Sequence, residues 1–201
     1  MGRSQNDDLR LAHSPSSARL SRPSRPGSLI VRTVYLLRHA KSSWEDPTLA
    51  DHDRPLAPRG RKAAPRMGAY LRREGLVPNL VLSSTALRAR QTWELVAPSL
   101  PPDIRVEFRK EIYGTDPVEL LGILRTSPDD AGTVMLIGHN PALEDCAARL
   151  AGAGDPAALK RMASKYPTAA LAEIAFDADR WSVIEPGTGR LTRFVRPKDL
   201  D

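Results

Sequence analysis

The feature that most constrains the fold is the segment over residues 33–40, which reads Thr-Val-Tyr-Leu-Leu-Arg-His-Ala. Its first five residues are β-branched, aromatic or aliphatic, a composition typical of a buried strand. The segment ends with Arg38 and His39, and a hydrophobic core does not accept such side chains unpaired. It therefore predicts a central strand that leaves the core and delivers a guanidinium and an imidazole to one edge of a sheet. In open α/β sheets, ligands bind at the edge formed by the carboxyl ends of the strands.

The positive charge of the chain is concentrated near its N-terminus. Residues 1–32 hold six arginines and two aspartates, a net charge of +4, whereas the rest of the chain holds 24 basic and 22 acidic side chains, a net charge of +2. The arginines of the N-terminal part are not interleaved with aromatic residues, so we expect no binding to nucleic acid. A single cysteine cannot form an internal disulfide, and no run of 18 apolar residues suggests a membrane span. We expect a cytoplasmic protein without membrane attachment.

The composition divides the chain into two parts. Residues 1–28 are rich in Ser, Arg and Pro and contain almost no apolar run, so they cannot bury enough surface to offset the entropy of ordering. We predict a disordered, basic N-terminal extension over residues 1–28. Residues 29–201 have the length and apolar content of one globular domain.

Strand and helix patterns alternate along this domain. Periodicity and turn residues predict helices over residues 59–75, 86–97, 116–126 and 141–151, and strands over residues 33–37, 80–82, 104–108, 133–137, 169–176, 181–184 and 190–195. In the third helix we expect Val118, Leu121 and Leu124 to point inward. The pattern predicts a three-layer α/β sandwich with a mostly parallel central sheet and an antiparallel edge.

Three of the predicted strands end in polar residues. Arg38 and His39 follow the first, Ser84 follows the second with Arg88 on the next helix, and His139 and Asn140 follow the strand over residues 133–137. Since parallel strands end at the same edge of a sheet, we expect these side chains to converge there.

Histidines, arginines, a serine hydroxyl and helix N-termini at one edge form an anion site, and arginine pairs with phosphate oxygens in a bidentate way. Guanidinium groups would repel a metal ion, so we expect no metal and no cofactor. A protein nucleophile must then take the phosphoryl group, and a neutral histidine nitrogen suits this role. Nearby arginines favour the neutral imidazole by lowering its pKa.

Several segments together resemble the histidine phosphatase superfamily, the group that includes phosphoglycerate mutases. They are Leu37-Arg38-His39-Ala40, the run from Ser83 to Thr92, and Gly138-His139-Asn140-Pro141. Four further segments are similar to its SixA subfamily of phosphohistidine phosphatases. They are the run from Arg38 to Trp44, the segment from Asp51 to Leu56 with Arg59-Gly60, Tyr166-Pro167-Thr168-Ala169-Ala170, and Arg196-Pro197. The resemblance covers about residues 33–198.

The resemblance implies a phosphoglycerate mutase-like fold and a role for each site residue. His39 is expected to be the nucleophile that forms a phosphohistidine intermediate, which water then hydrolyses. Arg38 and Arg88 are expected to bind the phosphate oxygens, and His139 to stabilise the transferring group. We also expect Asn140 and Ser84 to contact the substrate.

The sequence does not identify which residue donates the proton to the leaving group. Asp51, Asp53 and Glu111 are the candidates, but the spacing around Glu111 differs from the mutase pattern and the acid role is not assigned to it. An alkoxide leaving group needs protonation in the transition state, whereas the imidazole of phosphohistidine is a much better leaving group. An uncertain acid therefore favours a phosphorylated protein carrying phosphohistidine as the substrate.

Two alternatives are a phosphatase of small phosphate esters and a phosphate-binding module without turnover. The four residues Arg38, His39, Arg88 and His139 argue against the second. Other polar residues have plainer interpretations. His52 is expected to be a loop histidine, Arg90 to point about 200° away from Arg88 around the helix, and Cys146 to lie in the core.

Overall fold

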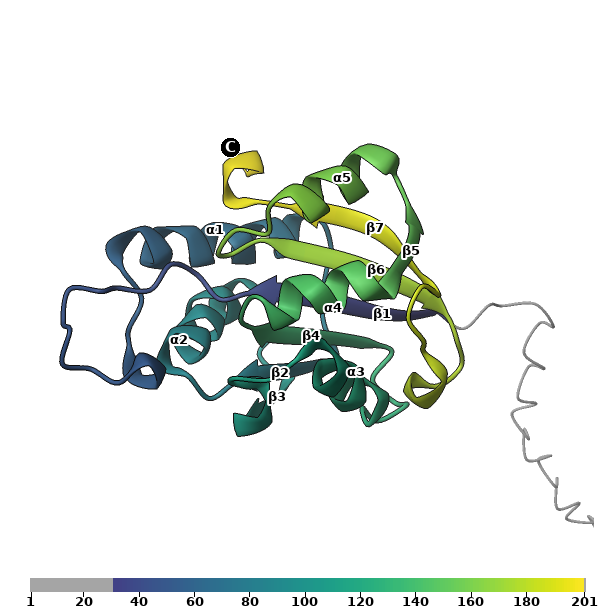
Figure 1. Cartoon of the computed structure of the whole chain (residues 1–201), viewed down its shortest axis with the longest axis horizontal. Helices are drawn as coiled ribbons and strands as arrows, with labels where there is room; N and C mark the ends of the chain where they lie inside the picture. Colours follow the sequence, from purple (N-terminus) through teal and green to yellow (C-terminus); the bar gives the residue numbers. More distant parts are fainter. Residues whose placement is uncertain (1–30, 201) are drawn as a thin grey trace, which may run out of the picture.

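The central strand predicted from residues 33–37 is β1 (Val31–Arg38), and it lies in the middle of a seven-stranded sheet of order β3-β2-β4-β1-β6-β7-β5. This computed structural model describes residues 31–200, so the extension predicted over residues 1–28 lies outside the described residues (Figure 1). The other strands are β2 (Leu80–Ser84), β3 (Arg105–Arg109), β4 (Thr133–Gly138), β5 (Ala151–Gly154), β6 (Leu171–Asp177) and β7 (Gly189–Val195).

The pairing of the strands decides which residues share an edge of the sheet. β1 pairs in parallel with β4, β4 with β2, and β2 with β3. β6 is antiparallel to both β1 and β7, so β7 runs in the same direction as β1. The carboxyl ends of β1, β2, β4 and β7 therefore lie at one edge. This confirms the mostly parallel sheet with antiparallel pairing on one side.

Helices cover both faces of the sheet, which confirms the three layers (Figure 1). The helices are α1 (Pro58–Arg73), α2 (Leu87–Val96), α3 (Pro117–Arg125), α4 (Ala142–Leu150) and α5 (Pro156–Ser164). Because side chains alternate along β1, Tyr35 and Leu37 pack in the core beneath α1 and α2. Val34 and Leu36 pack in the opposite core, beneath α3, α4 and α5.

Two local features bring α1 close to the end of β1. Pro58 stands at the first position of the helix, where its missing N–H costs nothing. Gly60 faces the backbone of Lys41, and a Cβ atom at this glycine would lie only 2.2 Å from the Lys41 carbonyl oxygen. The absence of a side chain at residue 60 therefore lets the helix approach the segment that follows His39.

Three expectations about secondary structure were wrong or incomplete. Residues 181–184 form no strand: Trp181–Val183 is a short 3-10 helix, because the buried Trp181 indole anchors it by donating to the Ala131 carbonyl at 2.7 Å. Val118 does not point inward but is 60% exposed; Leu120 is buried in the helix in its place. Neither β5 nor α5 was predicted. β5 reads Ala-Gly-Ala-Gly, a sequence with weak strand propensity, and α5 is a short helix of nine residues.

Within residues 31–200, no helix combines the length and the apolar character needed to cross a membrane.

Candidate active site

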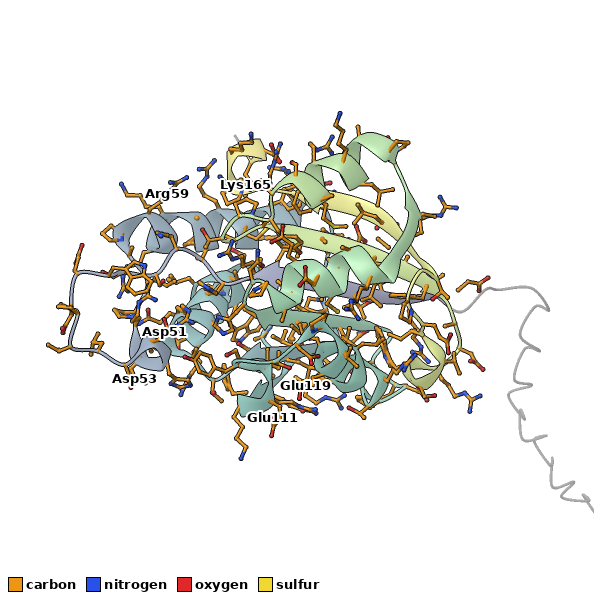
Figure 2. All side chains as sticks on the ribbon, viewed as in Figure 1. Asp51, Asp53, Arg59, Glu111, Glu119 and Lys165 are labelled. Atoms are coloured by element: carbon orange, nitrogen blue, oxygen red, sulfur yellow. The ribbon has the colours of Figure 1, made fainter. Side chains whose placement is uncertain are left out.

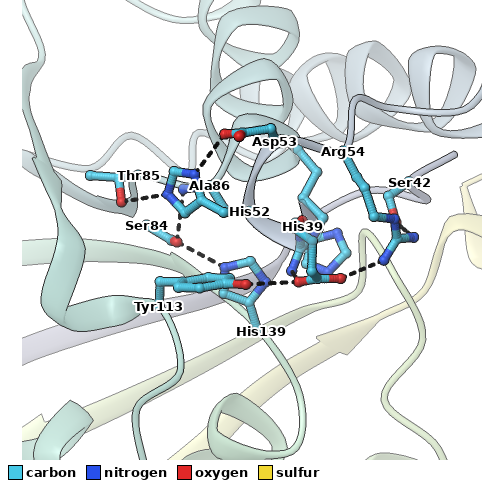
Figure 3. Close-up of polar contacts among 12 residues, drawn as sticks. His39, Ser42, His52, Asp53, Arg54, Ser84, Thr85, Ala86, Tyr113 and His139 are labelled. Atoms are coloured by element: carbon cyan, nitrogen blue, oxygen red, sulfur yellow. Dashed lines mark hydrogen bonds and ion pairs between the residues drawn. The ribbon is translucent and has the colours of Figure 1, made fainter. Parts of the chain in front are cut away.

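The polar residues at the ends of β1, β2 and β4 converge, as the sequence predicted. The rings of His39 and His139 lie with their centroids 4.9 Å apart, and Ser84 contacts His139 (Figure 3). Arg88, from the first turn of α2, is 6% exposed beside them. We call Arg38, His39, Arg88 and His139 the catalytic cluster, after the roles that the sequence predicts for them.

The backbone and the ring of His39 are both fixed. Its N–H donates to the Gly138 carbonyl at 3.1 Å, and the following Ala40 N–H donates to Thr92 Oγ1 at 2.9 Å. Nδ1 of His39 lies 2.7 Å from the Ala40 carbonyl oxygen. Since a carbonyl oxygen only accepts, Nδ1 carries the proton, and in a neutral ring Nε2 then has a free lone pair.

The environment keeps the His39 ring neutral. Burial has the largest effect on the pKa of His39 and lowers it. Neighbouring His139, Arg88 and Arg38 lower this pKa further, to about 3. His39 is 7% exposed. At neutral pH the Nε2 lone pair is therefore available for bonding.

Ala169 also fixes the backbone at the end of β1. Its N–H is shared between the carbonyl oxygens of Arg38 and His39, at 3.0 and 3.1 Å. Ala169 adopts a φ of 59°, in the left-handed region that costs an L-residue about 1–2 kcal/mol. Strained residues of this kind cluster at functional sites, where the surrounding structure holds them in place.

His139 is positioned by Ser84. His139 Nε2 lies 2.8 Å from Ser84 Oγ, and Ser84 is fully buried and accepts from the Ala86 N–H at 3.2 Å. Burial and the charge of Arg88 lower the pKa of His139 to about 3, so this ring is neutral as well. The contacts of Ser84 make it a positioning residue for His139.

Arg38 and Asn140 share one acceptor. Arg38 Nη1 donates to the Tyr166 carbonyl oxygen at 2.7 Å, and Asn140 Nδ2 donates to the same oxygen at 3.1 Å and to Glu144 Oε2 at 2.6 Å. Both amide hydrogens of Asn140 are therefore engaged within the protein. Arg38 Nε and His139 Nδ1 are buried and have no hydrogen-bond partner within residues 31–200. Such atoms are rare in folded proteins, and a catalytic role is one explanation for them.

Arg88 belongs to a network centred on Asp51. Arg88 Nη2 lies 2.9 Å from Asp51 Oδ2, Arg54 Nη1 lies 2.6 Å from Asp51 Oδ1, and the Tyr113 hydroxyl donates to Oδ2 at 2.9 Å. Burial alone would raise the pKa of Asp51, but hydrogen bonds from Arg54 and Tyr113 and the charge of Arg88 outweigh it. The pKa of Asp51 falls to about 2. Asp51 is thus ionised and joins the long loop after β1 to the catalytic cluster.

The other two proton-donor candidates lie outside the cluster. Asp53 is 64% exposed and pairs with His52 Nδ1 at 3.0 Å. Glu111 is exposed on a 3-10 helix (Lys110–Ile112) and forms no hydrogen bond or ion pair with the four cluster residues (Figure 2). Of the three candidates, only Asp51 contacts the cluster.

Two residues of the site have roles that the sequence did not predict. The Tyr113 ring lies edge-on to His139 with centroids 5.5 Å apart, and edge-on to His52 at 4.9 Å. Thr92 accepts from the Ala40 N–H and donates to the Arg88 carbonyl at 2.6 Å, so it joins the segment that follows β1 to α2. Tyr113 follows Glu111 by two residues, so its closeness in sequence to this candidate is the one signal that could have pointed to it.

The structure also places three side chains for which the sequence suggested plainer roles. Cys146 is buried, and burial raises the pKa of its thiol to about 12. Arg90 lies over the Phe108 ring at 5.0 Å, away from the cluster. His52 lies in a 3-10 helix (Asp51–Asp53) within the long loop, where its Nε2 lies 3.0 Å from Thr85 Oγ1.

Comparison with known proteins agrees with this geometry. Residues 34–115 match the family described as the histidine phosphatase superfamily (branch 1). An uncharacterised protein of Mycobacterium tuberculosis is 35% identical over 164 residues, which cover 81% of this chain and 100% of that protein. An uncharacterised chloroplast protein of Arabidopsis thaliana is 36% identical over 64% of this chain and 63% of its own length.

Similarity to solved structures indicates a group within this superfamily. A protein of Agrobacterium tumefaciens assigned as the phosphohistidine phosphatase SixA is 30% identical, with a TM-score of 0.70 over 83% of this chain and 98% of its own. A protein of Nakamurella multipartitia with the same assignment is 28% identical, with a TM-score of 0.71 over 83% of this chain and 96% of its own. The chain therefore belongs to the histidine phosphatase superfamily, in its SixA-type group, and is a phosphatase.

Proposed function

We propose that this phosphatase removes the phosphoryl group from phosphohistidine in proteins, without a metal ion, through a covalent intermediate on His39. The observation that carries the choice of substrate is the state of Asp51. It is the one proton-donor candidate that touches the catalytic cluster, and its pKa of about 2 keeps it ionised at neutral pH. An alkyl ester releases an alkoxide, which needs a proton donor in the transition state. Imidazole is a much better leaving group and does not need a proton donor from the protein.

The first step forms a bond between His39 Nε2 and phosphorus as the P–N bond of the substrate breaks. The electron pair of the broken bond stays on the substrate imidazole, which takes up a proton from solvent. Arg38 and Arg88 neutralise the charge on the phosphoryl oxygens as the group is transferred. His139 Nδ1, which is buried and unpaired within residues 31–200, is the further atom we assign to a phosphoryl oxygen.

The second step returns the enzyme to its starting state. A water molecule attacks phosphorus, the bond to His39 Nε2 breaks, and its electron pair returns to that nitrogen. The water loses one proton to solvent, and inorganic phosphate leaves. The hydrogen bond from His39 Nδ1 to the Ala40 carbonyl keeps the ring in the same tautomer throughout.

A substrate comparison tests the proposal. We expect kcat/KM for a phosphohistidine peptide to exceed that for an alkyl phosphate by at least about 100-fold, because only the alkyl ester needs a proton donor. Both rates are measured with EDTA present, and His39→Ala serves as the inactive control. Equal turnover of the alkyl phosphate would show that the enzyme is a phosphatase of small esters, and loss of activity with EDTA would contradict the metal-independent mechanism.

A further inference from the structure

A second group of basic side chains lies at the same edge of the sheet as the catalytic cluster. They line a cavity of about 210 Å³, and we call this cavity the basic pocket. Its basic residues are Lys41, Arg59, Lys165, Arg196 and Lys198. The catalytic residues do not include any of these five.

The topology places the basic pocket on the other side of β1 from Arg88 and His139. β4 and β2 lie on one side of β1, and β6 and β7 lie on the other. Lys165 precedes β6, and Arg196 follows the carboxyl end of β7, which points to the same edge as β1. Figure 2 shows Arg59 and Lys165 on the side of the molecule opposite to Glu111.

The pocket is also close to the nucleophile. Lys41 follows His39 by two residues, so their Cα atoms lie at most about 7 Å apart. Thr168, another residue of the pocket lining, directly precedes Ala169, whose N–H bonds to both the Arg38 and the His39 carbonyl oxygens. A substrate bound at His39 therefore has the pocket within reach of its neighbouring groups.

The charge of the pocket is largely uncompensated. Arg196 pairs with both carboxylate oxygens of Asp199, at 2.9 and 3.0 Å. The other four basic side chains form no ion pair within residues 31–200. Like charges gathered around one cavity repel each other and attract an anion.

The apolar residues that line the basic pocket favour a carboxylate side chain over a bare phosphate as its ligand. Ala63, Pro167 and Pro197 give the cavity an apolar wall. The methylene groups of an Asp or Glu side chain would contact this wall while the carboxylate meets the lysines. A phosphate group has no apolar part to bury.

From this geometry, and resting on the proposed function, we propose that the basic pocket binds an acidic side chain that flanks the phosphohistidine of a protein substrate. Recognition then needs two anions: the phosphoryl group at His39 and a carboxylate at the pocket. Small aryl phosphates would use the first site alone.

The test compares two double variants with the same change in charge. Arg59→Glu with Lys165→Glu reverses two charges of the pocket. Arg61→Glu with Lys160→Glu is the control. Arg61 lies on α1 with Arg59, Lys160 lies on α5, which ends one residue before Lys165, and both control residues are exposed and do not line the cavity. The substrates are a phosphohistidine peptide with flanking Glu residues, the same peptide with Gln, a small bisphosphate and an aryl phosphate.

We expect the pocket variant to raise KM for the Glu peptide about tenfold, with kcat within twofold of the wild type. KM for the Gln peptide and the aryl phosphate should not change, and the control variant should behave as the wild type. An unchanged KM for the Glu peptide, or an equal rise in the control, would overturn the proposal. A rise for the bisphosphate alone would assign the pocket to a second phosphate and overturn it as well.

Failure of the proposed function gives a different result. The wild type would then hydrolyse the aryl phosphate but neither peptide. In that case the unphosphorylated Glu peptide is tested as an inhibitor of aryl phosphate hydrolysis. A tenfold rise of its inhibition constant in the pocket variant alone would support the acidic-side-chain site, and an unchanged constant would contradict it.

Discussion

The two basic regions at the carboxyl edge of the sheet differ in burial, and burial decides what each can do. Arg88 is 6% exposed, and its charge is balanced by Asp51, whereas Lys165 and Arg59 are exposed and have no acidic partner within residues 31–200. In the buried region, loss of solvent lowers the pKa of His39 and keeps its ring neutral. In the open region, exposed lysines and arginines attract anions at longer range.

The comparison also shows why neighbouring residues of one type differ in role. Strand ends and tight backbone contacts build the buried region, so a change there alters chemistry. Side chains on helix surfaces and loops build the open region, so a change there alters recognition. Substitutions in the two regions should separate these effects.

The largest effect is expected from Arg88→Ala. This substitution removes a buried charge beside the phosphoryl position, so kcat/KM should fall by about 10²–10³-fold. Arg90→Ala is the matched control on the same helix, because Arg90 contacts the Phe108 ring instead, and its activity should stay within about twofold. Steady-state kinetics on an aryl phosphate measure both. Equal losses in the two variants would mean that the position of Arg88 has no special role.

A smaller loss, of about tenfold, is expected from Asp51→Asn. The amide no longer balances Arg54 and Arg88, so the Arg88 guanidinium is held less firmly. The measurement is kcat/KM across a series of aryl phosphates whose leaving groups differ in pKa. A positioning role predicts the same loss for every member. A loss that grows with the pKa of the leaving group would identify Asp51 as the general acid.

The two buried histidines should make stability depend on pH. Their pKa values are about 3 in the folded protein and about 6.5 in an unfolded chain, so between these values the unfolded state binds more protons. The free energy of unfolding should therefore fall as the pH drops below about 6.5, by up to about 1.4 kcal/mol per pH unit for each histidine. Urea denaturation at pH 7, 6 and 5 measures this change.

His39→Gln and His139→Gln each remove one of the two groups and should each make the dependence shallower. A free energy of unfolding that stays constant from pH 7 to pH 5 in the wild type would show that these rings are not held neutral by burial.

Much of the fold and the core of the site followed from the sequence, because the determining signals were local. The apolar run before Arg38, and its counterparts before Ser84 and His139, predicted strands that end at one edge, and the parallel pairing of β1, β4 and β2 brings them together. A resemblance over these same segments then indicated the family.

The features that were not predicted depend on contacts between distant segments. β5 pairs with β7 because Gly152 lets the strand approach Gly187, where a Cβ atom would lie 1.8 Å from the carbonyl oxygen. The state of Asp51 depends on Arg88 and Tyr113, which are 37 and 62 residues away along the chain. No local pattern encodes either contact.

The most direct test of the account is to trap the phosphoryl group on the protein. The enzyme is mixed with a labelled aryl phosphate, quenched in base within one turnover, and analysed for acid-labile, base-stable phosphate. We expect label on His39 in the wild type and in His52→Ala, and none in His39→Ala. Label that persists in His39→Ala, or that is lost only in His52→Ala, would contradict the assignment of His39 as the buried, neutral nucleophile.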